Sequence, residues 1–286
     1  MRRKQSSLSA SGIAIVRAVE SEKPEDARLC HDPYARFFVP TWLYILTAFF
    51  IRSGYAERRG PGVWGYLAVR ERYIDDVLQE QLNHGLEQLV ILGAGYDSRA
   101  YRFTGLIEQV KVFEVDHPAT QADKLKKLAG ILEDLPPYVT YVSVDFNTQS
   151  MEECLLESGF SSELKTLFIW QGVSMYLTPE AVDATLRFVT RHSAPGSAII
   201  FDYLERQVLE GVERHGEVIN MRRYRFMSGE ELTYAIDKDK LESFLKERGF
   251  CSIQNMNTME LKKIYFTGKN AGRNIASGYG IALAFV

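Results

Sequence analysis

The chain contains little cysteine and no cluster of metal-binding side chains. Its 286 residues include three cysteines, Cys30, Cys154 and Cys251, which lie far apart in the sequence. There is no CxxC pair and no Cys/His cluster, and the histidines are not spaced like metal ligands. The sequence therefore predicts no metal site, and it favours a reducing, cytoplasmic setting.

The chain also has no excess of positive charge and no long apolar run. The net charge is −3 and the isoelectric point is about 6.0, which argues against nucleic acid as a partner. The apolar run "GIAIV" behind the basic start is too short for the core of a signal peptide. The most apolar segment, residues 41–51, has about half the length that a membrane span requires. We expect a buried helix there, with a helix lying at a membrane surface as the alternative.

What the chain does contain is enough apolar material for a large core, arranged in alternating strand-like and helix-like segments. The composition is 46% hydrophobic and 12% aromatic. The expected strands are residues 86–93, 110–116, 139–146, 167–173, 197–204 and 279–286. The expected helices are residues 117–132, 150–159, 178–193 and 238–250, with Asn147 and Thr178 as cap candidates and Pro179 in a first helical position. This alternation predicts a parallel sheet with right-handed crossovers.

Two segments interrupt or precede this alternation. Residues 1–80 look mainly helical, and residues 205–237 form a charged insertion without a strand pattern. Open α/β sheets bind ligands at the carboxyl edge of their strands, so both segments are candidates to cover that edge. We therefore expect a helical cap over residues 1–80 and a Rossmann-like catalytic domain over residues 81–286.

The end of the first expected strand carries two glycines, in "VILGAGYDSR". Gly93 and Gly95 allow the backbone to approach a ligand closely because neither has a Cβ atom. Asp116 ends the second strand, where a carboxylate can accept hydrogen bonds from both hydroxyls of a ribose. The alternatives are a structural role for the glycines in a tight turn and a helix N-cap role for Asp116.

A second carboxylate, at the end of the third expected strand, distinguishes between nucleoside ligands. Asp145 and Phe146 end the third strand, where the carboxylate can accept from an adenine amine and the ring can lie beside the base. The dinucleotide-binding motif has a glycine where Ser98 stands in this chain, which weakens a nicotinamide dinucleotide as the ligand. An acidic residue for the ribose and another for adenine suit S-adenosylmethionine, which has no pyrophosphate.

These motifs resemble the leucine carboxyl methyltransferase family, in particular its bacterial branch of candidate S-adenosylmethionine-dependent methyltransferases. The resemblance rests on "VILGAGYDSRAYRF", "FEVDHP" and "WQGVSMYLTPEAVDATL", and it extends to "HDPYARFF", "RERYIDD" and "ELTYAIDKDKLESFLKERGF". It covers nearly the whole chain. It implies a class I methyltransferase fold, a doubly wound and mostly parallel sheet with an antiparallel last strand, plus a helical N-terminal cap.

The resemblance also implies roles for individual residues. Gly93, Asp116 and the Asp145–Phe146 pair would contact S-adenosylmethionine, and Arg70 would hold its methionine carboxylate. Gln171 stands where the family usually has a glutamate that faces the methionine amine. Glutamine keeps an acceptor oxygen but has no charge, so a Gln171→Glu substitution is expected to tighten binding, unless a carboxylate such as Asp97 already holds the amine.

Methyl transfer is an in-line displacement that needs alignment more than acid–base chemistry. A carboxylate acceptor is already ionised, and Arg99, Arg102 or Arg72 could position it. A hydroxyl acceptor needs a base, for which His117 and Tyr176 are the candidates. Arg99 and Arg102 could instead form structural ion pairs, and Tyr176 could be a core tyrosine.

The sequence thus predicts an S-adenosylmethionine-dependent methyltransferase that acts on a carboxylate, or on a hydroxyl, of a small molecule. The family name by itself does not indicate methylation of a protein's terminal leucine, which requires a matched docking surface. Two other classes stay open: a catalytically inactive S-adenosylmethionine-binding protein, which Gln171 keeps in view, and a nicotinamide-dependent oxidoreductase.

Overall fold

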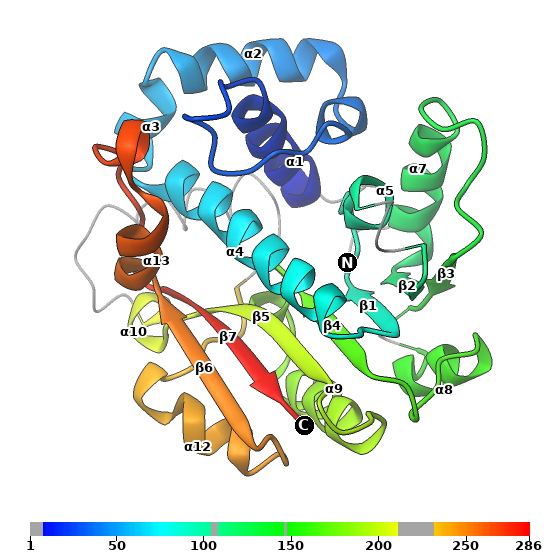
Figure 1. Cartoon of the computed structure of the whole chain (residues 1–286). Coiled ribbons are helices and arrows are strands. Elements are labelled where there is room, and N and C mark those ends of the chain that lie inside the picture. Colours follow the sequence, from blue (N-terminus) through cyan, green and yellow to red (C-terminus); the bar gives the residue numbers. More distant parts are fainter. Residues whose placement is uncertain (1–7, 104–107, 146–147, 211–231) are drawn as a thin grey trace.

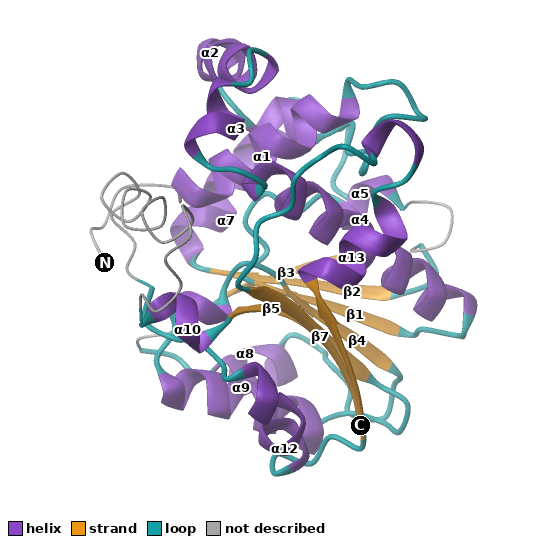
Figure 2. Ribbon diagram, turned by 90° about the vertical axis from the view of Figure 1, so that its left-hand side faces the viewer, coloured by secondary structure: helices purple, strands orange, loops and turns teal. Residues whose placement is uncertain are grey.

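The computed structural model describes residues 8–103, 108–145, 148–210 and 232–286, and these residues build a sheet between two layers of helices (Figures 1 and 2). The seven strands are β1 (Gln88–Leu92), β2 (Lys111–Asp116), β3 (Val139–Ser143), β4 (Thr166–Trp170), β5 (Ala198–Leu204), β6 (Ser252–Asn257) and β7 (Tyr279–Phe285). Their order is β3-β2-β1-β4-β5-β7-β6. Strands β1 to β5 are parallel, whereas β7 is antiparallel to β5 and β6. The predicted doubly wound fold with an antiparallel last strand is confirmed.

Successive side chains of a strand point to opposite faces, so each face of the sheet has its own core. Leu89 and Ile91 of β1 pack with the layer of α1, α4 and α13, while Val90 and Leu92 pack with the layer of α8, α9 and α12. The first layer contains α1 (Leu8–Ser21), α4 (Val63–Asn83), α5 (Arg99–Arg102), α7 (Pro118–Leu128) and α13 (Thr258–Tyr265). The second contains α8 (Met151–Glu157), α9 (Pro179–Arg191) and α12 (Leu241–Lys246).

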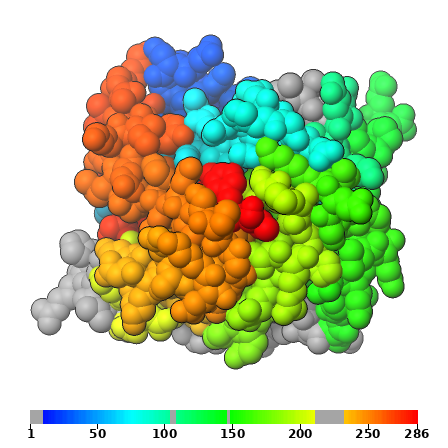
Figure 3. Space-filling view, turned by 60° about the horizontal axis from the view of Figure 1, so that its bottom comes forward, coloured from blue at the N-terminus to red at the C-terminus, as the bar shows by residue number. Residues whose placement is uncertain are grey.

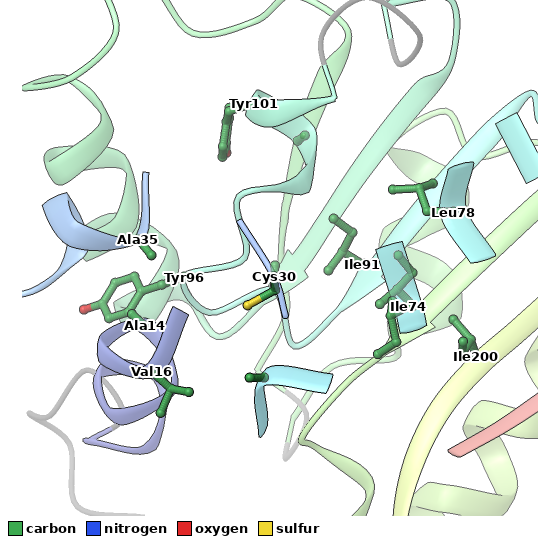
Figure 4. Packing of buried hydrophobic residues seen from close by; sticks show 14 of the residues in the cluster. Ala14, Val16, Cys30, Ala35, Ile74, Leu78, Ile91, Tyr96, Tyr101 and Ile200 are labelled. Carbon is green, nitrogen blue, oxygen red and sulfur yellow. The ribbon is translucent and has the colours of Figure 1, made fainter. Parts of the chain in front are cut away.

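The N-terminal helices share one hydrophobic cluster with the sheet. Figure 4 shows Ala14 of α1 and Ile74 of α4 in the same cluster as Ile91 of β1 and Ile200 of β5. Helix α4 continues to Asn83, past the boundary expected at residue 80. On the face seen in Figure 3, the segment of β6 and α13 (orange) lies against α4 (cyan).

The predicted strands and helices are confirmed to within a few residues at most ends. Thr178 caps α9 by accepting a hydrogen bond from the Ala181 amide at 3.3 Å, and Pro179 occupies the first helical position. Asn147 lies outside the described residues. Strand β6 was not predicted, because its sequence "SIQNMN" is largely polar and exposed, and it pairs only with β7.

The charged insertion over residues 205–237 is described only at its two ends. It begins with α10 (Arg206–Leu209), and Glu205 forms an isolated parallel bridge with Ile236. The remaining short elements are η1 (Ala35–Phe38), α3 (Tyr55–Arg59), η2 (Ser174–Tyr176), η3 (Lys238–Lys240) and η4 (Gly268–Asn270).

Helix α2 (Thr41–Arg52) corrects one expectation. The segment is a helix, as predicted, but it is not buried: only Tyr44 and Ala48 are enclosed. The helix lies at the outer edge of the molecule, away from the sheet (Figure 1). Hydropathy alone cannot distinguish a buried apolar helix from an exposed one, and this is why the prediction was wrong. Among the described residues, no helix is both long and apolar enough to cross a membrane.

Candidate active site

The turn after β1 is held against the end of β2. Gly93 and Gly95 have φ angles of 66° and 45°, in the left-handed region that favours glycine. A Cβ atom on Gly93 would lie 2.5 Å from Cγ2 of Val173, so the close approach also requires glycine. The amide of Gly95 donates to Oδ2 of Asp116 at 2.5 Å. The glycine turn and the carboxylate of Asp116, which the sequence predicts to lie together, are therefore in direct contact.

Asp116 has one further partner, because its Oδ1 accepts from the His117 amide at 2.6 Å. Each carboxylate oxygen has two lone pairs, so both oxygens of Asp116 keep an acceptor site for a ligand hydroxyl. Burial raises the pKa of Asp116, although the two backbone hydrogen bonds oppose this shift. The N-cap alternative for Asp116 is wrong: His117 caps α7, with Nδ1 accepting from the Ala119 amide at 3.2 Å.

Beside the turn lies a buried group of charged residues that we call the Glu71 ionic cluster. Its members are Arg17, Asp32, Glu71, Asp75, Asp97, Arg99 and Arg102. Nη2 of Arg99 lies 2.8 Å from Oε2 of Glu71, and Nη1 of Arg17 lies 3.4 Å from Oε1 of Glu71. Arg17 also donates to the carbonyl of Tyr96. The cluster thus joins α1, α4 and the segment that follows Gly95.

The charge state of Glu71 follows from its neighbours. Burial alone would raise the pKa of this carboxyl, but the guanidinium groups of Arg99 and Arg17 outweigh burial and lower it to about 2. Glu71 is therefore ionised at neutral pH even though it is enclosed.

The cluster corrects the catalytic prediction for Arg99. The side chain of Arg99 is fully buried, and its three nitrogens pair with Asp75, Asp97 and Glu71. Arg102 is also bound, with Nη1 and Nη2 at 2.7 and 2.6 Å from the two oxygens of Asp75. Neither guanidinium can reach an acceptor in this arrangement, and the structural ion-pair alternative describes both. Asp97 is engaged in the same way.

Arg70 occupies a different position, one residue before Glu71 on α4. Its Nη1 lies 2.5 Å from Oδ2 of Asp202 on β5, and Oδ1 of Asp202 accepts from the Gly172 amide at 2.6 Å. The Nε and Nη2 atoms of Arg70 are buried and have no hydrogen-bond partner among the described residues. Burial would lower the pKa of Arg70, but the Asp202 carboxylate raises it, so the group stays charged. Buried, unpaired donors of a cation are costly, and they fit an anionic ligand.

Gln171 lies between these two groups. Its Nε2 donates to Oε1 of Glu71 at 2.5 Å, and its Oε1 is buried without a partner among the described residues. The carboxylate beside Gln171 is therefore Glu71, not Asp97. Arg70 and Glu71 are neighbours in α4, and Gln171 and Gly172 are neighbours after β4. Together they place unpaired donors and an unpaired acceptor close to each other.

Tyr66 is a candidate site residue that the sequence analysis does not name. It lies one helical turn before Arg70 on α4 and is 1% exposed, and its hydroxyl has no partner among the described residues. Its ring stacks on Tyr279, with centroids 4.3 Å apart. Burial and the Asp202 carboxylate raise the pKa of Tyr66, so the hydroxyl remains a proton donor. The i, i+4 spacing of Tyr66 and Arg70 was the available signal, since such residues share a helix face.

The other residues predicted from sequence have no described contact with Arg70, Gln171 or the glycine turn. Asp145 follows β3, and its amide donates to Oε1 of Gln149 at 2.9 Å, while Phe146 lies outside the described residues. Tyr176 packs against a separate apolar cluster that includes Leu204 at the end of β5. Arg72 is exposed and pairs with Asp76 at 2.8 Å. No group of three His, Cys, Asp or Glu residues in the described part of the chain could hold a metal ion.

Comparison with known proteins adds independent information. The family model for leucine carboxyl methyltransferase matches residues 10–190. A candidate S-adenosyl-L-methionine-dependent methyltransferase of Bacillus subtilis is 32% identical over 200 residues, which cover 70% of this chain and 66% of that protein. A candidate enzyme of the same description from Streptomyces coelicolor is 34% identical over 202 residues, or 70% of each chain. The chain thus spans about two thirds of these relatives, slightly less for the Bacillus protein.

A solved structure supports the fold. A candidate methyltransferase from Thermobifida fusca superposes with a TM-score of 0.59 at 15% identity, over 96% of this chain and 94% of that one. The chain therefore belongs to the leucine carboxyl methyltransferase family and has the class I fold of S-adenosylmethionine-dependent methyltransferases.

Proposed function

We propose that this chain transfers the methyl group of S-adenosylmethionine to a carboxylate oxygen of a small molecule. The observation that carries the proposal is the set of buried, unpaired polar atoms at Arg70 and Gln171. The methionine end of S-adenosylmethionine carries a carboxylate and an amine on the same carbon atom. Arg70 offers two donors to the first, and Oε1 of Gln171 offers an acceptor to the second. The family of the chain supports the same cofactor.

The rest of the cofactor would lie along the glycine turn. The Gly95 amide holds the Asp116 carboxylate beside this turn, and the free lone pairs of Asp116 would accept from the ribose hydroxyls. We assign Asp145 and Phe146 to the adenine end, on the family resemblance. When bound, S-adenosylmethionine supplies a methyl group that is already activated on a sulfonium. The protein then has to align the acceptor and exclude water.

The acceptor assignment rests on what the buried donors can do. A carboxylate is ionised at neutral pH and needs hydrogen-bond donors but no base. The Tyr66 hydroxyl is such a donor, because its raised pKa keeps the proton on the oxygen. A hydroxyl acceptor remains the second candidate, and it would need Tyr176 as a base. Arg99 has no part in either proposal.

We also propose that the helices up to residue 80 act as a cap over the carboxyl edge of the sheet. Ala10 of α1 supports this role, since its Cβ lies 3.5 Å from the point where a Cβ on Gly95 would be. Most of the insertion over residues 205–237, the second cap candidate, lies outside the described residues.

The acceptor proposal is tested with a methyl-labelled cofactor and a set of small carboxylic acids. A methyl ester product should release volatile labelled methanol in mild base, whereas an alkali-stable product would contradict carboxyl methylation.

Tyr66→Phe removes one buried donor and should lower kcat/KM about tenfold, corresponding to the loss of one hydrogen bond of about 1.4 kcal/mol. Tyr176→Phe should have a smaller effect, and the reverse order would favour a hydroxyl acceptor.

The ribose assignment is tested at Asp116. Asp116→Ala removes a charge-assisted contact to two hydroxyls and should weaken S-adenosylhomocysteine binding at least about tenfold in calorimetry. Asp116→Asn keeps an acceptor oxygen for the Gly95 amide and should give an intermediate affinity. Asp134→Ala, at an exposed position between α7 and β3, serves as the control. Unchanged affinity in Asp116→Ala, with the thermal midpoint also unchanged, would overturn the assignment.

The contact between Gln171 and Glu71 reverses the effect expected from sequence. Gln171→Glu would place a second carboxylate where Nε2 now lies, 2.5 Å from an ionised Glu71 oxygen. Like charges at this distance repel, so S-adenosylhomocysteine affinity should fall about tenfold instead of rising. Gln254→Glu makes the same change at an exposed position of β6 and should have no effect. Tighter binding in Gln171→Glu would show that the amine, not Glu71, dominates this site.

A further inference from the structure

The outer face of α2 and its flanks form the most concentrated exposed apolar surface among the described residues. The side chains of Trp42, Ile45 and Phe49 are 68%, 61% and 64% exposed. Seven of the twelve large hydrophobic residues that are exposed in the described chain lie between residues 37 and 55. Concentrated exposed apolar surface of this kind usually marks a protein or membrane contact. We refer to Phe37, Trp42, Ile45, Leu46, Phe49, Phe50 and Tyr55 as the α2 face.

The charges on and beside the α2 face are mostly positive. Residues 34–62 contain four arginines and one glutamate, a net charge of +3 in a chain whose total is −3. Arg58 and Arg59 are exposed at the end of α3, next to α2. Two carboxylates lie beside this surface, and both are bound. Oε1 of Glu57 accepts from the Gly62 amide and from Asn274, both at 2.9 Å, and Glu22 pairs with Arg52 and accepts from the Tyr44 hydroxyl. The surface is thus apolar in the middle and basic at one end.

We propose that the α2 face docks on the surface of a membrane that contains anionic phospholipid. Trp42, Ile45 and Phe49 would enter the boundary between headgroups and acyl chains, and Arg58 and Arg59 would lie at the phosphates. At 12 residues, α2 is about 18 Å long, so it can lie in one leaflet but cannot cross a bilayer. An apolar hollow of about 440 Å³ opens on the same face, between Ile45, Phe49 and Arg52.

Charge complementarity favours a lipid surface over a second copy of the chain. In a two-fold dimer the same patch meets itself, so the basic ends of two α2 faces would be brought into one interface. The carboxylates beside the face, Glu22 and Glu57, are already bound, Glu22 to Arg52 and Glu57 to the Gly62 amide and Asn274. A layer of anionic phosphates neutralises the arginines without this conflict. The position of α2 at the outer edge of the molecule leaves the face accessible (Figures 1 and 2).

The test is sedimentation of the full chain with vesicles of phosphatidylcholine, with and without phosphatidylglycerol. The chain should bind the anionic vesicles, and binding should weaken when salt is raised, because the arginines act through charge. Trp42→Ala combined with Phe49→Ala should lower the partition coefficient about tenfold or more. Met259→Ala combined with Ile264→Ala is the matched control: it removes two apolar residues, 68% and 54% exposed on α13, and should bind as the unchanged chain does.

Fluorescence gives a second readout on the same samples. Trp42 is the exposed tryptophan of the three in the chain, since Trp170 is buried and Trp64 partly so. Anionic vesicles should shift the emission to shorter wavelength, and the shift should disappear in Trp42→Phe without loss of binding. Equal sedimentation of the α2 variant and the unchanged chain would overturn the proposal. So would a lipid-free dimer that the α2 substitutions dissolve, because the face would then be a contact between copies.

Discussion

The arrangement of the proposed site depends on the pairing of charges inside the Glu71 ionic cluster. Taking a charge out of water costs several kcal/mol, and the cost is offset only when partners and hydrogen bonds are in place. Arg99 meets this condition with three carboxylates, and Glu71 meets it with Arg99, Arg17 and the Gln171 amide. Since these residues come from α1, α4, the glycine turn and the end of β4, satisfying the charges fixes four segments relative to one another.

The fixed segments leave a second set of polar atoms unsatisfied. Arg70 is anchored through one nitrogen by Asp202, which also holds the Gly172 amide, while Nε and Nη2 of Arg70 have no partner among the described residues. Anchoring one edge of a guanidinium orients the other edge and lowers the side-chain entropy that is lost when a ligand binds. Gln171, which follows the neighbouring strand β4, presents its buried Oε1. The Glu71 ionic cluster therefore fixes the positions of the surrounding segments, whereas the Arg70–Asp202 pair orients the unpaired nitrogens of Arg70 toward a ligand.

Much of this could be predicted from local sequence. The glycine turn and Asp116 were found because a parallel strand, its turn and the next strand end have a fixed spacing along the chain. Local patterns cannot show which charges meet in space. The sequence therefore leaves Arg99 open as a catalytic or an ion-pairing residue, and it does not show the partners of Glu71 and Asp202. The exposure of α2 and the existence of β6 were missed for a related reason. Burial depends on what the fold places beside a segment, and a polar edge strand has no hydrophobic pattern of its own.

The most direct test of this account is a crystal structure of the chain with S-adenosylhomocysteine. We expect one ligand to extend from Asp116 to Arg70, with its ribose hydroxyls on the Asp116 carboxylate, its own carboxylate on Nε and Nη2 of Arg70, and its amine on Oε1 of Gln171. The ion pairs around Glu71 should be unchanged, because they form the frame and not the binding surface. A ligand whose carboxylate lies away from Arg70, or whose binding requires the pair of Arg99 and Glu71 to separate, would contradict the account.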